Sequence, residues 1–434
     1  MARSRGRTAV TGVVVVAVAA GGWLWARHGD DRHETITAAT GAYPAAFGSA
    51  PPDAPGTAVR RTADSYGVTG ALSVDEIADL DLHHDGVEAH DLHTGKSYWR
   101  YTRTGADLNR VALSGTGDTV ALWWEDGLIT ALDVRTGKPR WRHTLTYGDL
   151  PGDSGGIADL RMSGGLVLAQ RRGDLTAFDT VSGKKRWTAE LPEGCGQTYG
   201  MVRLMDKTVV AEGSCGKDQE NQLFGFDRQS GELRWKLAYK FLSPVPAGDH
   251  TLVSTMWSGG DSGATVDISG AKPAVTTYSV LSDQPVVAAD DDVVLCVDNT
   301  ERNDEHEGSL VAFGVGDHRQ RWTAQPAKGL RFGDPLLAGN RVYVVEQPSR
   351  VDIDDDLKPL LDHYDARLVV LDAATGRQLS STPVPVPKPD ASWHDVQSDS
   401  ELMPQQATSG LVTVAWVGMG IGSSLLHDLS VLAE

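Results

Sequence analysis

An eleven-residue phrase recurs along this chain and constrains its fold more than any other feature. The phrase runs from Ala131 to Trp141, with copies at 89–99, 177–187 and, with Gly for Ala, 225–235, so the tryptophans lie 42, 46 and 48 residues apart. A period of this length with a fixed signature indicates a repeat architecture. The residues that the copies share are Ala89, Asp91, Gly95, Trp99, Ala131, Asp133, Gly137, Trp141, Ala177, Asp179, Gly183, Trp187, Asp227, Gly231 and Trp235.

The phrase fits the outer half of a small antiparallel sheet. An extended apolar stretch, such as residues 128–132, precedes the Asp, and a second short strand follows the Gly and ends in Trp. The Asp side chain can accept hydrogen bonds from turn amides, and Gly supplies the positive φ that a hairpin requires. We expect Ala and Trp to pair across the two strands, because the small residue leaves room for the indole. Further β-rich runs precede each phrase, so each period holds four strands.

Weaker copies extend the repeats toward the C-terminus. They occupy residues 266–270, 312–322 and 370–376, and they retain Trp322, Asp372 and Gly376 of the signature. Residues 411–417 and 424–431 read as two more strands without an outer strand of their own. These counts predict an all-β fold, an eight-bladed β-propeller of four-stranded blades, with a seven-bladed ring as the alternative.

Ring closure is expected to use the start of the propeller. Residues 57–62 have a composition suited to a strand and could complete the last blade. Closure of this kind removes the exposed sheet edges that otherwise invite aggregation. The propeller would then occupy residues 57–434.

The consensus Ala-x-Asp-x-x-Thr-Gly-x-x-x-Trp resembles the tryptophan-docking repeat of the pyrroloquinoline-quinone-like β-propellers. Four good copies and three weak ones cover roughly residues 60–434, so the resemblance is specific for the fold. For function it implies a choice, because the family includes quinoprotein dehydrogenases, the propeller subunit of the outer-membrane β-barrel assembly machinery and sensor ectodomains of bacterial kinases.

The N-terminus indicates a location. Arg3, Arg5 and Arg7 precede an uncharged apolar run from Ala9 to Ala26. Such a pattern is typical of a signal anchor or of a cleavable signal peptide, and the run is close to the ~20 residues that span a bilayer. We expect residues 1–28 to form a cytoplasmic stub and a single transmembrane helix, with the propeller on the extracytoplasmic side of the cell membrane. Cleavage after the small residues is the alternative.

Residues 29–56 are expected to be a flexible linker. They are rich in Ala, Gly and Thr, contain four prolines and show no apolar period. Segments of this composition bury too little apolar surface to offset the entropy of ordering.

Charge restricts the partners. Residues 1–28 hold four arginines and no acidic residue, so the rest of the chain has 36 basic and 58 acidic side chains, a formal charge of −22. An excess of negative charge argues against nucleic acid and against anionic lipid headgroups, because both attractions need positive charge on the protein.

The three cysteines predict one disulfide. Cys195 and Cys215 are equally spaced about Met205, near the turn between two expected strands, so antiparallel pairing brings them opposite each other. An oxidising compartment favours a bond between them. Cys296 lies in an apolar stretch and is expected to be a free, buried thiol.

Long acidic loops are the best functional indication. The connections between the second and third strands are short in blades two and three but long at residues 299–309 in blade six and 347–366 in blade seven. Long loops on one face of a rigid scaffold often carry function. The candidate partner-binding residues are Glu301, Asp304, Glu305, Glu307, Asp352, Asp354, Asp355 and Asp356.

Two classes of function compete. The first is a non-catalytic, membrane-anchored binding or scaffold module for a protein or cell-envelope partner, built as a monomeric propeller without a cofactor. The second is a divergent quinone- or metal-dependent oxidoreductase. No catalytic motif is found in the chain, and the adjacent cysteine pair that the resemblance implies for a quinoprotein dehydrogenase is not present. We therefore expect the first class and no enzyme activity.

Overall fold

The computed structural model describes most of the chain beyond residue 32. The described residues are 33–56, 58–62, 65–78, 84–114, 117–145, 158–171, 173–197, 202–217, 220–239, 244–255, 262–279, 286–298, 308–348, 365–385, 401–417 and 427–433. No helix within these ranges has the length and apolarity needed to cross a membrane. The predicted anchor at residues 9–26 lies outside them.

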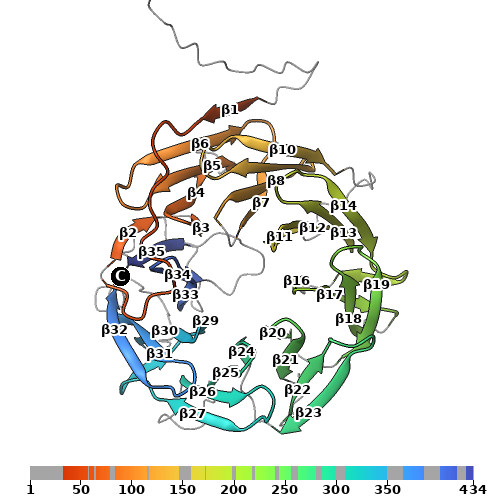
Figure 1. Cartoon of the computed structure of the whole chain (residues 1–434), viewed down its shortest axis with the longest axis vertical. Coiled ribbons are helices and arrows are strands. Elements are labelled where there is room, and N and C mark those ends of the chain that lie inside the picture. The colour runs from red at the N-terminus through yellow and green to blue at the C-terminus, as the bar shows by residue number, and fades with distance from the viewer. Residues whose placement is uncertain are drawn as a thin grey trace, which may run out of the picture.

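The described strands form eight antiparallel sheets arranged as blades around a central axis (Figure 1). The four strands of a blade follow one another in sequence from the axis to the rim. The strands of blades 1 to 4, from the axis outward, are β3 (Ser65–Thr69), β4 (Leu72–Ala78), β5 (His84–Asp91) and β6 (Ser97–Arg103); β7 (Leu108–Leu113), β8 (Thr119–Trp124), β9 (Leu128–Asp133) and β10 (Pro139–Thr144); β11 (Ala158–Ser163), β12 (Leu166–Arg171), β13 (Asp174–Asp179) and β14 (Lys185–Glu190); and β15 (Cys195–Gln197) with β16 (Arg203–Leu204), β17 (Thr208–Cys215), β18 (Glu220–Asp227) and β19 (Leu233–Ala238).

Blades 5 to 8 follow the same plan, and the N-terminal segment adds one strand to blade 1 and one to blade 8. The added strands are β1 (Glu34–Thr37), outside β6, and β2 (Ala58–Thr62). The strands of blades 5 to 8 are β20 (Val245–Ala247), β21 (Thr251–Thr255), β22 (Ser262–Asp267) and β23 (Ala274–Ser279); β24 (Val286–Ala289), β25 (Val293–Asp298), β26 (Ser309–Gly314) and β27 (Gln320–Ala324); β28 (Leu330–Phe332) with β29 (Leu336–Ala338), β30 (Arg341–Pro348), β31 (Ala366–Asp372) and β32 (Gln378–Val384); and β33 (Glu401–Thr408), β34 (Leu411–Val417), β35 (His427–Ala433) and then β2.

The eight-bladed prediction and its closure are confirmed. Strand β2 pairs with β35 in an antiparallel register that joins Ala58 to Leu432 and Thr62 to Leu429. The N-terminal strand is therefore the outermost strand of the last blade. The inner strand of that blade, β33, was not predicted.

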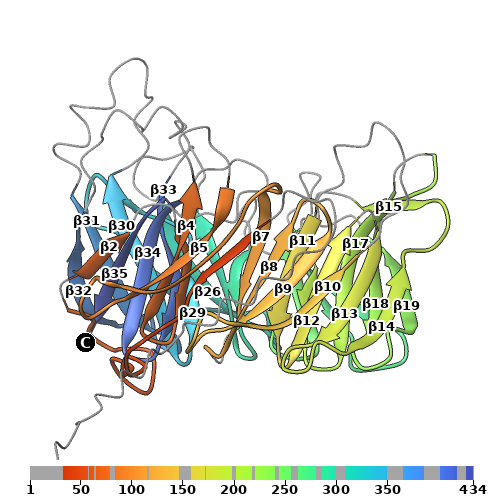
Figure 2. The same ribbon diagram turned by 90° about the horizontal axis from the view of Figure 1, so that it is seen from above.

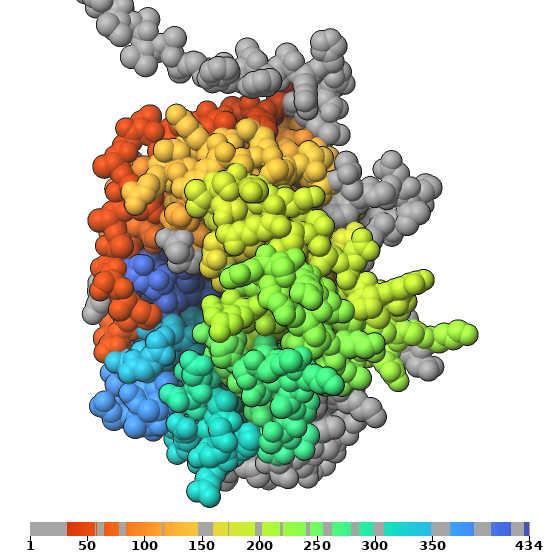
Figure 3. Space-filling model, turned by 45° about the vertical axis from the view of Figure 1, so that its right-hand side comes forward, coloured from red at the N-terminus to blue at the C-terminus, as the bar shows by residue number. Residues whose placement is uncertain are grey.

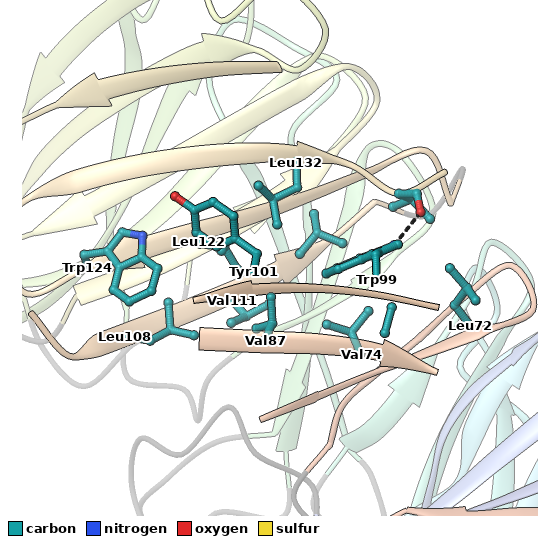
Figure 4. Packing of buried hydrophobic residues seen from close by; sticks show 13 residues of the cluster. Leu72, Val74, Val87, Trp99, Tyr101, Leu108, Val111, Leu122, Trp124 and Leu132 are labelled. Carbon is teal, nitrogen blue, oxygen red and sulfur yellow. Dashed lines mark hydrogen bonds between the residues drawn. The ribbon is translucent and has the colours of Figure 1, made fainter. Parts of the chain in front are cut away.

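Each blade docks onto the next through the tryptophan of the repeated phrase. The indole Nε1 of Trp99 donates to the carbonyl of Val134 in blade 2 at 2.7 Å, and Trp141 donates to Thr180 in blade 3 at 2.9 Å. Trp187 and Trp322 make the same bond to the next blade. Figure 4 shows Trp99 lying among the apolar side chains that blades 1 and 2 bury between them.

The glycine of the phrase is the platform for that indole. Gly137 has a φ of 67°, and a Cβ built on it would lie 2.7 Å from Trp99. The aspartate holds the same turn, because Asp133 Oδ1 accepts the backbone N–H of Arg135 at 2.9 Å. Within the blade, Ala131 pairs with Trp141 across the two outer strands, as the sequence predicts.

Two weak copies of the phrase have substitutes for the missing residues. His318 takes the glycine position in blade 6 with a φ of 54°, and Tyr278 of blade 5 stacks on its ring at 3.9 Å, in place of a docked tryptophan. In the same turn, Gly314 stands where Asp is usual, and the carboxylate of Asp317 occupies the space beside it.

Residues 38–56 differ from the flexible linker that their composition predicts. They form a strap that runs from β1 across blades 1, 8 and 7 and returns to β2 (Figure 2). The backbone of Gly48 donates to Ser409 at 2.6 Å, and Gly410 donates back to Ala50 at 2.8 Å. The backbone of the strap forms these hydrogen bonds with the propeller. A count of apolar side chains in the sequence therefore does not predict that the strap is ordered.

Side chains of the propeller also fix the strap at two further places. On blade 1, Phe47 stacks on the ring of His93 with centroids 4.1 Å apart. On blade 7, the hydroxyl of Tyr343 donates to the carbonyl of Pro52 at 2.7 Å, and Arg341 binds the Asp53 carboxylate at 2.6 and 2.9 Å. The pKa of Asp53 is lowered, chiefly by this bond to Arg341.

Tryptophan docking can be tested at the glycine platform. Gly137→Ala should lower the free energy of unfolding by about 3 kcal/mol or more, because the new methyl group meets Trp99 and left-handed backbone disfavours a Cβ. Gly165→Ala is the control, since Gly165 has a φ of 76° but nothing within 4 Å of its Cβ position. Equal losses for the two variants in chemical denaturation would contradict the docking role.

Gly410→Ala should release the strap without opening the ring, because a Cβ at Gly410 would collide with the backbone of Phe47 and Gly48. We expect faster amide hydrogen exchange over residues 45–56 and unchanged exchange in β35. Gly339→Ala, at a turn with a φ of 61° and an open Cβ position, should leave the strap protected. Protection of the strap in both variants would show that this crossing does not hold it.

Candidate functional site

The propeller has two chemically different faces, seen edge-on in Figure 2. The turn face carries the Asp–Gly turns and the strap. The loop face carries the connections between second and third strands and those between blades. The two acidic loops begin and end on the loop face of adjacent blades, after β25 and before β26, and after β30 and before β31.

The predicted partner-binding residues lie outside the described residues. This applies to Glu301, Asp304, Glu305 and Glu307 in blade 6, and to Asp352, Asp354, Asp355 and Asp356 in blade 7. The structure describes the ends of both loops, and one end of each, at Gly308 and Gln347, lies beside polar side chains between blades 7 and 8. We call Arg331, Asp334, Gln347 and Glu401 the blade 7–8 cluster.

A buried ion pair forms the centre of the blade 7–8 cluster. Arg331 Nη2 of β28 lies 2.7 Å from Glu401 Oε2 of β33, with side chains 9% and 8% exposed. At such burial each charge depends on the other, because removal of one partner leaves an uncompensated charge. The pair therefore fixes the inner strand of blade 7 against that of blade 8.

Asp334 extends the cluster and titrates abnormally. Burial, followed by the charge of Glu401, raises the pKa of Asp334 to about 6, and the charge of Arg331 opposes this rise. The backbone N–H of Asp334 donates to Glu401 Oε1 at 3.4 Å. A carboxyl group that changes charge near neutral pH is a common property of functional sites, although structural networks show it too.

Gln347 and Gly308 connect the cluster to the acidic loops. The Gln347 side chain donates to the Leu402 carbonyl at 3.1 Å and accepts from the Leu402 N–H at 3.0 Å, so it joins blade 7 to blade 8 just before the loop at 349–364. Gly308, which follows the loop at 299–307, accepts a bond from Phe332 at 2.9 Å beside Arg331. One end of each acidic loop therefore lies next to the blade 7–8 cluster.

Sequence reasoning missed these four residues. None belongs to the repeated phrase, and Glu401 lies on a strand that was not predicted. Arg331 and Glu401 are 70 positions apart, so only the ring geometry brings them together. The only indication in the sequence was that these residues lie close to long segments between expected strands.

The predicted disulfide is present on the loop face of blade 4. Cys195 and Cys215 are paired in register between β15 and β17, with Cα atoms 4.0 Å apart. Cys296 is free and buried in blade 6, and burial raises the pKa of its thiol to about 12.

Two histidines of blade 1 contact carboxylates. His90 Nδ1 lies 2.8 Å from Asp75 Oδ2, and His84 lies 2.5 Å from Glu76. The side chain of His90 is 21% exposed, and its Nε2 lies 3.7 Å from Glu88 Oε2. Among the described residues, no group of three or more His, Cys, Asp or Glu side chains is placed to hold a metal ion.

Comparisons with known proteins support the fold and indicate a family. The pattern of the family described as outer membrane protein assembly factor BamB matches residues 75–236 and 225–421. The solved structure of the computationally designed Ika8 protein is 14% identical and covers 88% of this chain and 100% of its own, with a TM-score of 0.53. That likeness shows the fold alone. No curated protein matches the chain.

Two natural proteins are also similar, with TM-scores below 0.5. BamB from Moraxella catarrhalis is 17% identical and covers 85% of this chain and 100% of its own, with a TM-score of 0.47. The quinohemoprotein alcohol dehydrogenase ADHIIG from Pseudomonas putida HK5 is 14% identical and covers 84% of this chain and 73% of its own, with a TM-score of 0.48.

The titration of Asp334 predicts a pH-dependent stability. Because the pKa rises from 3.8 to about 6 on folding, the folded state binds the proton more tightly, and stability falls as pH increases from 3.8 to about 6. Asp334→Asn should remove this slope and raise the free energy of unfolding at pH 7 by on the order of 2 kcal/mol. Asp249→Asn, at an exposed turn, should preserve the slope. Denaturation midpoints across this pH range provide the measurement.

Proposed function

This chain belongs to the family of the outer membrane protein assembly factor BamB, a family of pyrroloquinoline-quinone-like β-propellers, and we propose that it is a non-catalytic binding or scaffold module. The proposed module is anchored to the cell membrane by residues 9–26 and holds its propeller on the extracytoplasmic side. Its partner is a protein or another component of the cell envelope, bound at the loop face of blades 6 to 8.

The family match is the observation that carries this proposal. It spans residues 75–421, most of the propeller, and its description names a factor that assembles other proteins. A rigid ring with long loops on one face suits that role, because the blades hold the loops in place while the loops vary in length. The blade 7–8 cluster supports the idea, since it holds one end of each acidic loop, at Gly308 and Gln347.

The cysteines favour binding over quinone chemistry. Two of the three form the disulfide of blade 4 and the third is buried in blade 6. None is adjacent to another, unlike the cysteine pair expected of a quinoprotein dehydrogenase. The alternative, a divergent quinone- or metal-dependent oxidoreductase, requires a cofactor that stays with the full-length protein on purification, which absorption spectra and metal analysis would detect.

Partner binding should depend on the acidic loops. We expect crosslinking in intact cells to capture a basic partner. The Asp-to-Asn substitution of Asp352, Asp354, Asp355 and Asp356 should then slow its association several-fold at low salt, and less at higher salt, where charges are screened beyond ~8 Å.

The control is an equal change of charge on the opposite face. The exposed residues Asp206, Asp249, Asp291 and Asp292 lie at turns on the turn face, and their replacement by Asn should leave the association rate unchanged. If both quadruple variants bind as fast as the parent protein, the acidic loops are not the docking site. If both are slowed equally, only the net charge of the propeller matters.

A further inference from the structure

The outer rim of blades 1 to 3 is basic, although the whole chain has a formal charge of −18. The turns and outer strands of these blades, residues 91–103, 133–145 and 179–190, hold ten basic and four acidic side chains. The corresponding segments of blades 4 to 7 hold seven basic and five acidic side chains. Positive charge is therefore concentrated on one side of the ring.

Six of these basic side chains are exposed and have no carboxylate partner among the described residues. The other four are paired with Asp126, Asp133, Glu34 and Asp179. Arg135 lies over the ring of Tyr43, with its guanidinium carbon 4.6 Å from the ring centroid. We define the basic rim as Lys96, Arg100, Arg135, Lys138, Lys184 and Lys185.

The basic rim spans consecutive blades. Lys96, Lys138 and Lys184 occupy the residue after the glycine of each phrase, so the repeat places them at equivalent points of blades 1, 2 and 3. Arg100 and Lys185 lie on the outer strands β6 and β14. The surface of blades 2 and 3 is continuous in Figure 3, where yellow and yellow-green residues adjoin.

The N-terminal segment enters the propeller beside this rim. Strand β1 pairs with β6, and Glu34 forms an ion pair with Arg142 of blade 2. His33 and Thr104 exchange hydrogen bonds at 3.0 and 3.2 Å. Only residues 27–33 separate the apolar run from this fixed point, a length that can reach at most about 25 Å when fully extended.

We propose that the basic rim docks on an anionic lipid surface, so that the propeller lies with the edge of blades 1 to 3 against its membrane. This inference rests on the proposed anchor at residues 9–26. The negative charge of the whole chain does not prevent docking, because charges farther from the headgroups than the ~8 Å screening length contribute little. The loop face of blades 6 and 7, which do not adjoin blades 1 to 3 in the ring, stays accessible to a partner.

The experiment compares two exposed valines in the full-length protein. Val181 is 64% exposed in the turn that precedes Lys184, and Val275 is 41% exposed on the outer strand of blade 5. A photoreactive amino acid replaces one or the other, and the protein is reconstituted into vesicles of phosphatidylcholine with or without phosphatidylglycerol. We expect lipid adducts at position 181 to exceed those at 275 by about fivefold or more, only in the anionic vesicles.

Charge variants provide matched controls. Lys96→Glu, Lys138→Glu, Lys184→Glu and Lys185→Glu together should abolish the excess at position 181. The same number of reversals elsewhere, at the exposed residues Lys236, Lys272, Arg319 and Arg321, should preserve it.

Carbonate extraction separates this inference from the proposed anchor. A chain that resists extraction but gives equal lipid adducts at both positions overturns the basic rim and leaves the anchor intact. A chain that is extracted but still gives the excess at position 181 overturns the anchor alone. Adducts at position 181 with a protein instead of lipid in whole cells would reassign the rim to an acidic protein and overturn the inference.

Discussion

The contact between a tryptophan of one blade and the glycine turn of the next is the interaction on which the ring depends. The same turn closes a hairpin in its own blade and supports the indole of the preceding blade, as Gly137 does for Trp99. One phrase thus specifies both the hairpin of its own blade and the site where the tryptophan of the preceding blade docks. Where a tryptophan docks on this turn, as at Gly137, two blades require a small residue at the same position.

Other contacts are found where tryptophan docking is missing. Blade 5 has Tyr278 stacked on His318, and blade 7, with Ser380 at the tryptophan position, is joined to blade 8 by Arg331, Gln347 and Glu401. The strap covers the seam between blades 8 and 1, where blade 8 has no copy of the phrase and hence no tryptophan to dock on blade 1. Assembly of the ring thus explains part of the polar cluster near the candidate site.

Much of the fold could be predicted from the sequence, because the residues that form the turn and the tryptophan that packs between blades lie within one eleven-residue phrase. Blade number and the disulfide of Cys195 with Cys215 followed from spacing, and closure by residues 57–62 followed from their composition and from the incomplete last blade. The strap could not be predicted from composition, since backbone groups such as those of Gly48 hold it. The blade 7–8 cluster could not be predicted either, because Arg331 and Glu401 meet only after the ring has closed.

The pairing of β2 with β35 determines when the ring of blades can close during folding. These strands are separated by almost the whole sequence, and contacts between such distant segments form late because a long loop must first be closed. During synthesis β2 therefore keeps an unpaired edge until β35 has left the ribosome. A chain interrupted before residue 427 would keep an open blade, which quality-control proteases could recognise as an unfinished protein.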